Sequence, residues 1–315
     1  MRELDLQAIL AGADEALPDG HRSGLVALVG RPNVGKSTLL NAMVGEKVAI
    51  VTDVPGTTRN AIRGVVTRDD AQIVFLDTPG IAKPRTLLTR RLNELVRETW
   101  SGVEAICFLV DVADGVGSGD AWLAEQLREV NTPIVIVANK EDLVRRDKAK
   151  LVPELQKLAE LLPDAEVVPT SAADGFNVDH LLDVLVGVLP EGPRMFPDGT
   201  VSDQPEQQLA AEIIREKFIT RMSDELPHSI AIVIDDFGVA EHREDLIEIR
   251  AAVVVERDSQ KGIVIGKGGK VLKAAATAAR RELEVVLGSK VYLDLRVKVA
   301  KEWQKDPRQL GRLGY

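Results

Sequence analysis

The fold is decided by residues 25–40, which read LVALVGRPNVGKSTLL. The apolar run Leu25–Val29 leads directly into the pattern GxxxxGK[ST] at residues 30–37. The run predicts a buried strand and the residues after Ser37 predict a helix, so the glycine-rich loop joins a strand to a helix. This is the arrangement of a P-loop, in which the glycines let backbone N–H groups turn inward around a phosphate.

Further apolar runs alternate with amphipathic segments as far as residue 189. Runs rich in Val, Ile and Leu are typical of strands buried on both faces, and their alternation with helices indicates βα units. The runs are Ile73–Leu76, Ala105–Val110, Ile134–Ala138 and Val167–Val168. Residues 61–68 predict one more strand, antiparallel to 71–77. The sequence therefore predicts an α/β domain with a mixed, mostly parallel sheet.

The pattern changes after residue 189. Residues 190–205 are rich in Pro, Gly and Asp without periodicity, which is typical of a linker. Helical periodicity from Glu206 is followed by two strands, a glycine-rich turn, a helix over 268–286 and a two-faced strand over 291–299. This order of elements predicts a second domain, of the α+β class.

Composition excludes several classes of protein. The 315 residues suggest two domains, and 45% hydrophobic residues are enough for real cores. A single cysteine, Cys107, excludes a disulfide framework or a cysteine-based metal cluster and favours a reducing cytoplasm. No apolar stretch reaches 18 residues, and the first 23 residues show no leader pattern, so neither a membrane span nor a targeting signal is predicted.

The net charge of −9 is unevenly distributed. Residues 1–205 carry 21 basic and 31 acidic residues, a net of −10, whereas residues 206–315 carry 19 and 18, a net of +1. Within 258–290, seven basic residues stand against three acidic ones, a local net of +4. This asymmetry is a weak indication of a local anion-binding surface, and a solvated helix face is the more common cause of such a charge pattern.

The tetrad Asn139-Lys140-Glu141-Asp142 follows an apolar run directly. A carboxylate here accepts two hydrogen bonds from the N1–H and amine of guanine, and adenine offers no such pair of donors. Ligands of α/β sheets bind at the carboxyl ends of strands, where Ser171 and Ala172 also lie in the predicted fold. The tetrad therefore favours GTP over ATP.

Two further motifs lie between the P-loop and the tetrad. Asp77-Thr-Pro-Gly80 ends a predicted strand, where its carboxylate can reach Mg²⁺ through water and the Gly80 amide can sense a γ-phosphate. The stretch Pro55–Arg59 predicts a mobile loop whose threonine completes the Mg²⁺ shell. Ser37 offers the ion a hydroxyl, and Lys36 offers its charge to the β- and γ-phosphates.

The order GxxxxGKS, TTR, DxxG, NKxD and SA resembles that of the translation-factor-related GTPases, and GRPNVGKST resembles their Era and TrmE branch in particular. The resemblance implies a Ras-like P-loop G domain that hydrolyses GTP, with Mg²⁺ held by Ser37, Thr58 and Asp77; Thr57 is the alternative to Thr58. The catalytic residues implied are Asn33, Lys36, Thr58 and Gly80. The residues implied for GTP or GDP are Gly30, Arg31, Pro32, Asn33, Val34, Gly35, Lys36, Ser37, Thr38, Asp77, Thr78, Pro79, Gly80, Ile81, Asn139, Lys140, Glu141, Asp142, Ser171 and Ala172.

Ile81 stands where a Ras-like enzyme has its water-orienting glutamine. An isoleucine cannot position water by hydrogen bonding, so slow intrinsic turnover is predicted. In the similar branch the asparagine at the position of Asn33 helps to hold a K⁺ ion, which offsets charge in the transition state. The resemblance thus implies K⁺ stimulation, and a plain loop residue is the alternative for Asn33.

The stretch IVIGKGGK at 263–270 contains a GxxG turn before a helix. In KH domains such a turn lets a nucleic-acid backbone approach closely, although a lone GxxG also fits a plain helix–turn–helix. The αββααβ order and the neighbouring lysines favour the KH reading. The RNA-binding residues predicted are Lys261, Ile265, Gly266, Lys267, Gly268, Gly269, Lys270 and Lys273.

The arrangement resembles the type II KH domain of the Era family, and the similarity runs from about Leu25 to Tyr315. The implied domains are an extension (1–23), a G domain (24–189), a linker (190–205), a KH domain (206–300) and a tail (301–315). The family implies a largely monomeric GTPase that binds the 3′ end of 16S ribosomal RNA and acts in 30S subunit assembly. It also implies a cytoplasmic protein with peripheral contact with the inner membrane face, which nothing in the sequence shows directly.

Three rival functions each fit part of the sequence but lack a feature that they need or conflict with one that is present. A tRNA-modifying GTPase of the TrmE kind needs a terminal cysteine motif, and this chain ends in Leu-Gly-Tyr. A tandem G-domain assembly factor needs two GKS loops, and there is one. A plain RNA-binding module with a degenerate nucleotide site conflicts with the intact Lys36, Ser37 and Asp77.

Overall fold

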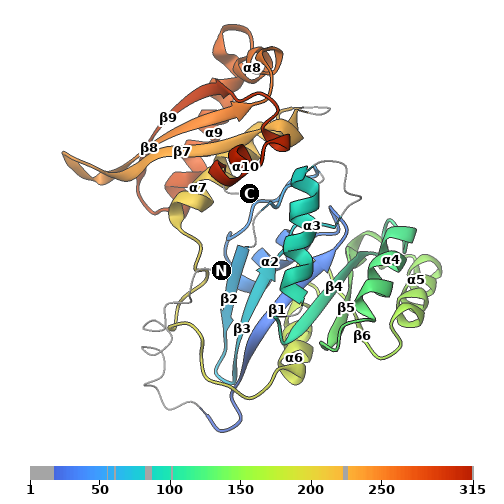
Figure 1. The fold of residues 1–315 in the computed structure, drawn as a ribbon. Coiled ribbons are helices and arrows are strands. Elements are labelled where there is room, and N and C mark those ends of the chain that lie inside the picture. Colours follow the sequence, from blue (N-terminus) through green and yellow to red (C-terminus); the bar gives the residue numbers. More distant parts are fainter. Residues whose placement is uncertain are drawn as a thin grey trace. The chain divides into compact units, whose positions relative to one another are not determined.

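The computed structural model describes residues 18–54, 56–59, 62–81, 87–100, 102–222 and 226–313. The chain forms two compact units, shown in Figure 1. Of the described residues, the first unit holds those within 18–48, 62–81 and 93–203, and the second holds those within 49–59, 87–92 and 204–313. None of the described helices is long and apolar enough to cross a membrane.

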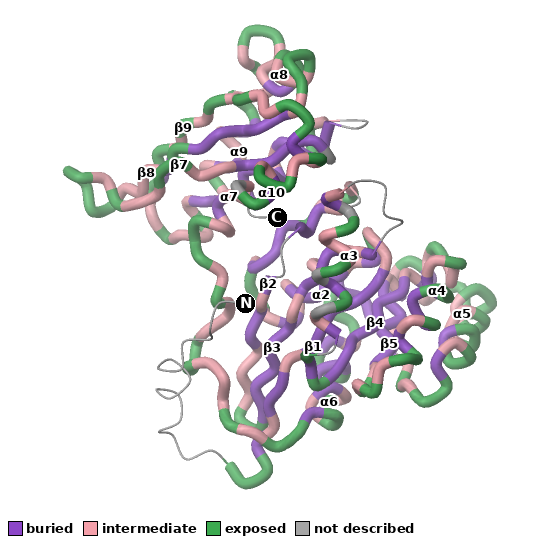
Figure 2. Tube along the Cα trace, viewed as in Figure 1, coloured by how far each residue is buried: buried purple, intermediate pink, exposed green. Residues whose placement is uncertain are grey.

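The first unit is built on a six-stranded sheet with the order β2-β3-β1-β4-β5-β6. Its strands are β1 (Arg22–Gly30), β2 (Ile62–Thr67), β3 (Ala71–Asp77), β4 (Ala105–Asp111), β5 (Ile134–Asn139) and β6 (Glu166–Pro169). β2 pairs antiparallel with β3, and the other pairs are parallel. The predicted mixed, mostly parallel sheet is therefore confirmed. Buried strands run through the middle of the unit in Figure 2.

Helices pack on both faces of this sheet. They are α2 (Lys36–Val44), α3 (Leu87–Trp100), α4 (Ser118–Leu127), α5 (Lys148–Leu161) and α6 (Val178–Val188), with a short 3₁₀ turn η2 (Glu141–Leu143) after β5. Val29 of β1 shares a core with Val96 of α3, Leu123 of α4 and Leu158 of α5. The last part of α3 thus covers the same face as α4 and α5, while its first six residues cluster with the second unit.

The second unit has the three-stranded sheet β7-β8-β9. Its elements are α7 (Glu206–Ile219), η3 (Pro227–Ser229), β7 (Ala231–Ala240), β8 (Arg243–Val255), α8 (Asp258–Ile265), η4 (Lys267–Gly269), α9 (Lys270–Val286), β9 (Lys290–Val299), η5 (Trp303–Lys305) and α10 (Pro307–Arg312). β9 runs parallel to β8, and α7 and α9 share a core with the sheet. This αββααβ order confirms the predicted KH fold.

The stretch predicted as a linker packs along the edge of the first sheet. Gln72, which is fully buried in β3, accepts hydrogen bonds from the backbone N–H groups of Met195 (2.6 Å) and Phe196 (2.8 Å) and donates one to the Phe196 carbonyl (2.9 Å). Val65 of edge strand β2 donates its N–H to the Val201 carbonyl at 2.9 Å. Residues 190–203 therefore belong to the first unit, and the second begins at Gln204.

Candidate functional site

The P-loop closes around the ammonium group of its own lysine. Gly35, the residue before α2, has the left-handed conformation φ 99°, ψ 24°. A Cβ atom there would lie 2.3 Å from Asn139 Nδ2, so only glycine fits. Lys36 is 6% exposed, and its Nζ donates to the carbonyls of Gly30 (3.2 Å) and Arg31 (2.9 Å). Burial lowers the pKa of Lys36 to about 8, against the opposing charge of Asp77.

Ser37 and Asp77 lie side by side at the phosphate end of this site. Asp77 ends β3 and is fully buried, and Ser37 Oγ donates to its Oδ2 at 2.6 Å. A hydroxyl oxygen and a carboxylate oxygen at this separation are ligands that Mg²⁺ prefers. The donor set therefore fits the ion predicted from the sequence. Thr78 fastens the strand end by donating its hydroxyl to the Leu28 carbonyl at 2.7 Å.

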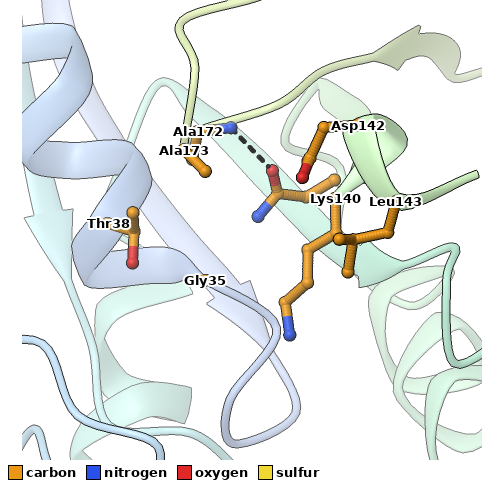
Figure 3. Close-up of a pocket in the computed structure, with 8 residues that line it drawn as sticks. Gly35, Thr38, Lys140, Asp142, Leu143, Ala172 and Ala173 are labelled. Atoms are coloured by element: carbon orange, nitrogen blue, oxygen red, sulfur yellow. Dashed lines mark hydrogen bonds between the residues drawn. The ribbon is translucent and has the colours of Figure 1, made fainter. Parts of the chain in front are cut away.

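A cavity lies where the tetrad after β5 faces the start of α2 (Figure 3). Asn139 braces its walls: Nδ2 donates to the Val34 carbonyl (2.7 Å) and Oδ1 accepts from the Ala172 N–H (3.1 Å). Asp142 Oδ1 accepts from Ser171 Oγ at 2.7 Å. The lining residues are Gly35, Thr38, Asn139, Lys140, Asp142, Leu143, Ala172 and Ala173. The structure thus brings three motifs that are far apart in the sequence to one cavity.

Lys140 takes a left-handed conformation, φ 63°, and its Nζ pairs with Asp111 Oδ2 at 2.7 Å. The next tetrad residue, Glu141, is buried and forms an ion pair with Arg145 rather than lining the cavity. Sequence reasoning missed Leu143 and Ala173, which line it. Their only signal is adjacency to the tetrad and to Ser171-Ala172.

Gly80 and Ile81 differ in their surroundings. A Cβ on Gly80 would lie 2.7 Å from the Pro32 nitrogen, so the backbone of this glycine packs directly on the P-loop. Ile81 is 5% exposed and joins the core that contains Val96. The side chain that replaces a water-orienting glutamine is therefore part of the hydrophobic core.

The predicted magnesium threonine belongs to the second unit. Thr57 and Thr58 are both buried, and the Thr57 hydroxyl donates to the Val54 carbonyl at 2.6 Å. Pro55, the first residue of the predicted mobile loop, lies outside the described residues. Of the three predicted magnesium ligands, Ser37 and Asp77 lie together in the first unit, and Thr58 belongs to the second unit.

Residues 49–59 are built into the second unit by long-range contacts. Ile50 is 1% exposed in the core of that unit. Arg215 of α7 donates to the Thr57 carbonyl and pairs with Glu212 at 2.6 Å. Arg59 donates to the Ile230 carbonyl at 2.9 Å and lies over the Trp303 ring, 5.6 Å from its centroid. The segment that follows α2 is therefore held by the KH unit.

The GxxG turn lies between α8 and α9. Gly266, Gly268 and Gly269 all have positive φ, at 71°, 63° and 75°. Lys267 and Gly268 are exposed, and so are Lys270 and Lys273 in the first turn of α9. Lys261 and Ile265 of α8 are half-buried. The structure thus gathers all eight predicted RNA-binding residues around one turn. Ile263 of α8, at the start of the same motif stretch, is 58% exposed.

Comparison with known proteins identifies both units. Residues 25–140 match the model of the 50S ribosome-binding GTPase family, and residues 225–304 match that of the KH domain. "GTPase Era" of Mycobacterium tuberculosis (strain ATCC 25618 / H37Rv) is 56% identical over 297 residues, which cover 93% of this chain and 98% of that protein. The corresponding protein of Mycobacterium sp. (strain KMS) is 54% identical over 297 residues, 93% of this chain and 99% of its own.

Two solved structures agree over nearly the whole chain. Era in complex with MgGDPNP and nucleotides 1506–1542 of 16S ribosomal RNA has a TM-score of 0.90 and 37% identity, and the match covers 94% of this chain and 99% of that one. A single-substitution variant of Aquifex aeolicus Era bound to GDP·AlF4⁻ has a TM-score of 0.90 and 38% identity, with coverage of 93% and 99%.

Proposed function

The chain belongs to the Era family of GTPases, and we propose that it couples GTP hydrolysis to binding of the 3′ end of 16S ribosomal RNA during assembly of the 30S subunit. One observation carries the proposal: a complete set of guanine-nucleotide motifs and a KH unit with an exposed GxxG turn occur in one chain. A relative of the same fold has been solved with this RNA segment and a GTP analogue.

Lysine substitutions in the GxxG turn test the RNA half of the proposal. Lys267→Asp puts a carboxylate where the proposal puts a phosphodiester, and adding Gly268→Asp puts in a second carboxylate. Gly268 has the left-handed φ of 63°, a backbone conformation that aspartate tolerates. Lys301→Asp, at an exposed lysine outside the turn, is the matched control. With a single-stranded 16S 3′-end oligonucleotide, the turn variants should lose affinity about tenfold or more and the salt slope should fall by about 0.7 per lost contact.

GTP turnover and melting temperature of the three variants should match the unmodified protein, because Lys267 and Gly268 are solvent-exposed. Unchanged RNA affinity in the double variant would contradict the role of the turn. An equal loss in Lys301→Asp would indicate an unspecific charge effect.

At the nucleotide site we propose that Ser37, Asp77 and Thr58 hold Mg²⁺, and that Lys36 and the Gly80 amide face the γ-phosphate. The adjacent oxygens of Ser37 and Asp77 support this. Thr57 stays the alternative to Thr58 as the third ligand. The ion neutralises charge on the β- and γ-phosphate oxygens. Asn139, Lys140 and Asp142 read guanine, with support from Ser171 and Ala172.

We propose in addition that K⁺ stimulates hydrolysis through Asn33. This residue is exposed at the tip of the P-loop with φ 65°, and the buried Ile81 leaves the chemistry without a water-orienting glutamine. Hydrolysis should be about tenfold faster in KCl than in NaCl, and Asn33→Ala should abolish the difference. Equal rates of the unmodified protein in both salts would remove the K⁺ role.

The location and assembly proposed are those of the family. We propose a cytoplasmic monomer with peripheral contact with the inner membrane face; of these, the cytoplasmic location accords with a single cysteine, Cys107, which is buried. Sedimentation equilibrium tests the monomer, and flotation with anionic vesicles tests the contact. Failure to float would restrict the protein to the cytoplasm.

A further inference from the structure

A buried carboxylate in α4 accepts a hydrogen bond from the side chain of Arg31, the second residue of the P-loop. Asp120 is fully buried, and its Oδ1 accepts a hydrogen bond from Arg31 Nε at 2.8 Å. Its Oδ2 accepts from the Gly117 backbone N–H at 2.9 Å. Both oxygens thus have a donor, and the guanidinium compensates a charge that would otherwise be costly to bury.

The start of α4 is shaped to receive the arginine. A Cβ on Gly119 would lie 2.8 Å from Arg31 Cδ, so a side chain there would push the arm of Arg31 aside. On the outer side Arg31 Nη2 reaches Asp114 Oδ2 at 3.4 Å, and that carboxylate is 69% exposed. The strong part of the contact is therefore the buried one, because a solvent-exposed ion pair contributes little.

The main chain of Arg31 faces the other way, toward the phosphate end of the site. Its carbonyl accepts from Lys36 Nζ at 2.9 Å. The Gly80 backbone packs against the Arg31–Pro32 peptide, since a Cβ on Gly80 would lie 3.1 Å from the Arg31 carbonyl carbon. One residue thus contacts α4 with its side chain and contacts both groups that face the γ-phosphate with its backbone.

We propose that Asp120 is a positioning residue for GTP hydrolysis: through Arg31 it fixes the P-loop backbone against which Lys36 and Gly80 are aligned. The inference rests on the nucleotide site proposed above. It also assigns the cation of Arg31 to the buried Asp120, with the exposed Asp114 contributing little, so this arginine orients the loop and does not contact phosphate.

Asp120→Asn is the informative variant, because the amide keeps the shape and can still accept from Gly117 while the charge is lost. We expect the single-turnover hydrolysis rate at saturating GTP to fall about tenfold. GDP affinity should fall clearly less than the rate, because GDP keeps the contact of Lys36 with the β-phosphate but lacks the γ-phosphate that the Gly80 amide faces. Asp114→Ala is the matched control and should leave both unchanged.

Arg31→Ala and the double variant complete the test. If the two side chains act as a unit, Arg31→Ala should be as slow as Asp120→Asn, the double variant should be no slower, and Arg31→Lys should recover part of the rate. Binding of fluorescent GDP tests the nucleotide site separately. If the unmodified protein did not bind GDP, the proposed nucleotide site would be refuted, and not the role of the Arg31–Asp120 contact.

Three results would overturn the proposal. Normal hydrolysis in Asp120→Asn would make the contact structural only. Parallel losses of GDP affinity, melting temperature and rate would do the same. Loss of nucleotide affinity in Arg31→Ala with none in Asp120→Asn would show that Arg31 contacts phosphate directly.

Discussion

The two glycine-rich turns of the molecule use the same backbone device in opposite surroundings. Gly35 precedes α2 and Gly269 precedes α9, both in the left-handed conformation, and neither helix start has a side-chain cap. Each turn therefore presents helix N-terminal N–H groups to an anion. In the P-loop a Cβ on Gly35 would strike Asn139, whereas nothing lies within 4 Å of one built on Gly268 or Gly269.

The difference fits the sizes of the two ligands proposed for these turns. A nucleotide is small enough to be surrounded, and the P-loop is packed against the tetrad, the DxxG segment and its own lysine. An RNA strand is a polymer that passes by, so the GxxG turn needs an open side. Enclosure leaves no room for a Cβ at Gly35, whereas at Gly268 and Gly269 an added Cβ costs mainly backbone strain. Gly266, which packs against Val271, is the closed side of the second turn.

The largest effect is expected from Gly35→Ala. The added Cβ forces Asn139 to move, and Asn139 braces both the P-loop and Ala172, so nucleotide affinity should fall about 100-fold or more. Gly45→Ala, at the other end of α2, has a similar φ of 81° with nothing within 4 Å of its Cβ. It should cost about 1–2 kcal/mol of stability and leave GDP affinity unchanged. Titration of labelled GDP against both variants measures the two affinities. Equal losses of GDP affinity would show that backbone strain, not the contact with Asn139, limits substitution in the P-loop.

A smaller effect should follow from the buried cation of the P-loop. Because the Lys36 pKa is about 8, its protonated fraction falls between pH 7 and pH 9, and GDP affinity should fall about tenfold over that range. GDP affinity falls, and does not rise, with pH because the phosphates bind the protonated, positively charged form of Lys36. The free protein should instead become more stable as pH rises from 8 toward 10.5, where the unfolded chain still holds the proton. Guanosine, which lacks phosphate, is the control ligand and should show no tenfold loss.

The smallest effect is expected at Gly268. Gly268→Ala adds a Cβ in open space and costs only left-handed strain, so RNA affinity should fall less than about fivefold. Gly266→Ala should be clearly worse, because its Cβ would lie 2.5 Å from Val271 Cγ2. Filter binding of the 16S oligonucleotide to both variants measures the contrast. A Gly268→Ala loss as large as that of Gly35→Ala for GDP would mean that the turn closes around its ligand.

Local patterns predicted most of the fold. The apolar runs correctly placed the strands of the first sheet, and two-faced alternation correctly placed β9, because burial on one or two faces leaves a direct trace in the sequence. The nucleotide motifs correctly predicted most residues of the cavity, because each motif directly follows a strand and the ends of parallel strands meet at one edge of the sheet. The helix predicted from 268 begins at Lys270, where the last glycine of the turn ends.

Long-range contacts were not predictable. Arg31 meets Asp120 across 89 positions, and Arg215 meets Thr57 across 158. Neither pair has a spacing that distinguishes it from ordinary surface charges. For the same reason the sequence did not indicate that residues 49–59 cluster with the KH unit, or that residues 190–203 follow the edge of the first sheet.

The bonds of Val65 and Gln72 to residues 195–201 give that stretch a protective role. β2 is an edge strand, and an uncovered edge is a template for pairing with another chain and hence for aggregation. The Val65 N–H that would offer itself to a second molecule is already bonded to Val201. A G domain truncated at Leu189 would leave this edge bare and would remove the hydrogen bonds of Gln72 to Met195 and Phe196, leaving its bond to Thr67. One truncated at Asp203 carries its own cover. For anyone who expresses the domain alone, solubility should therefore depend on these fourteen residues, 190–203.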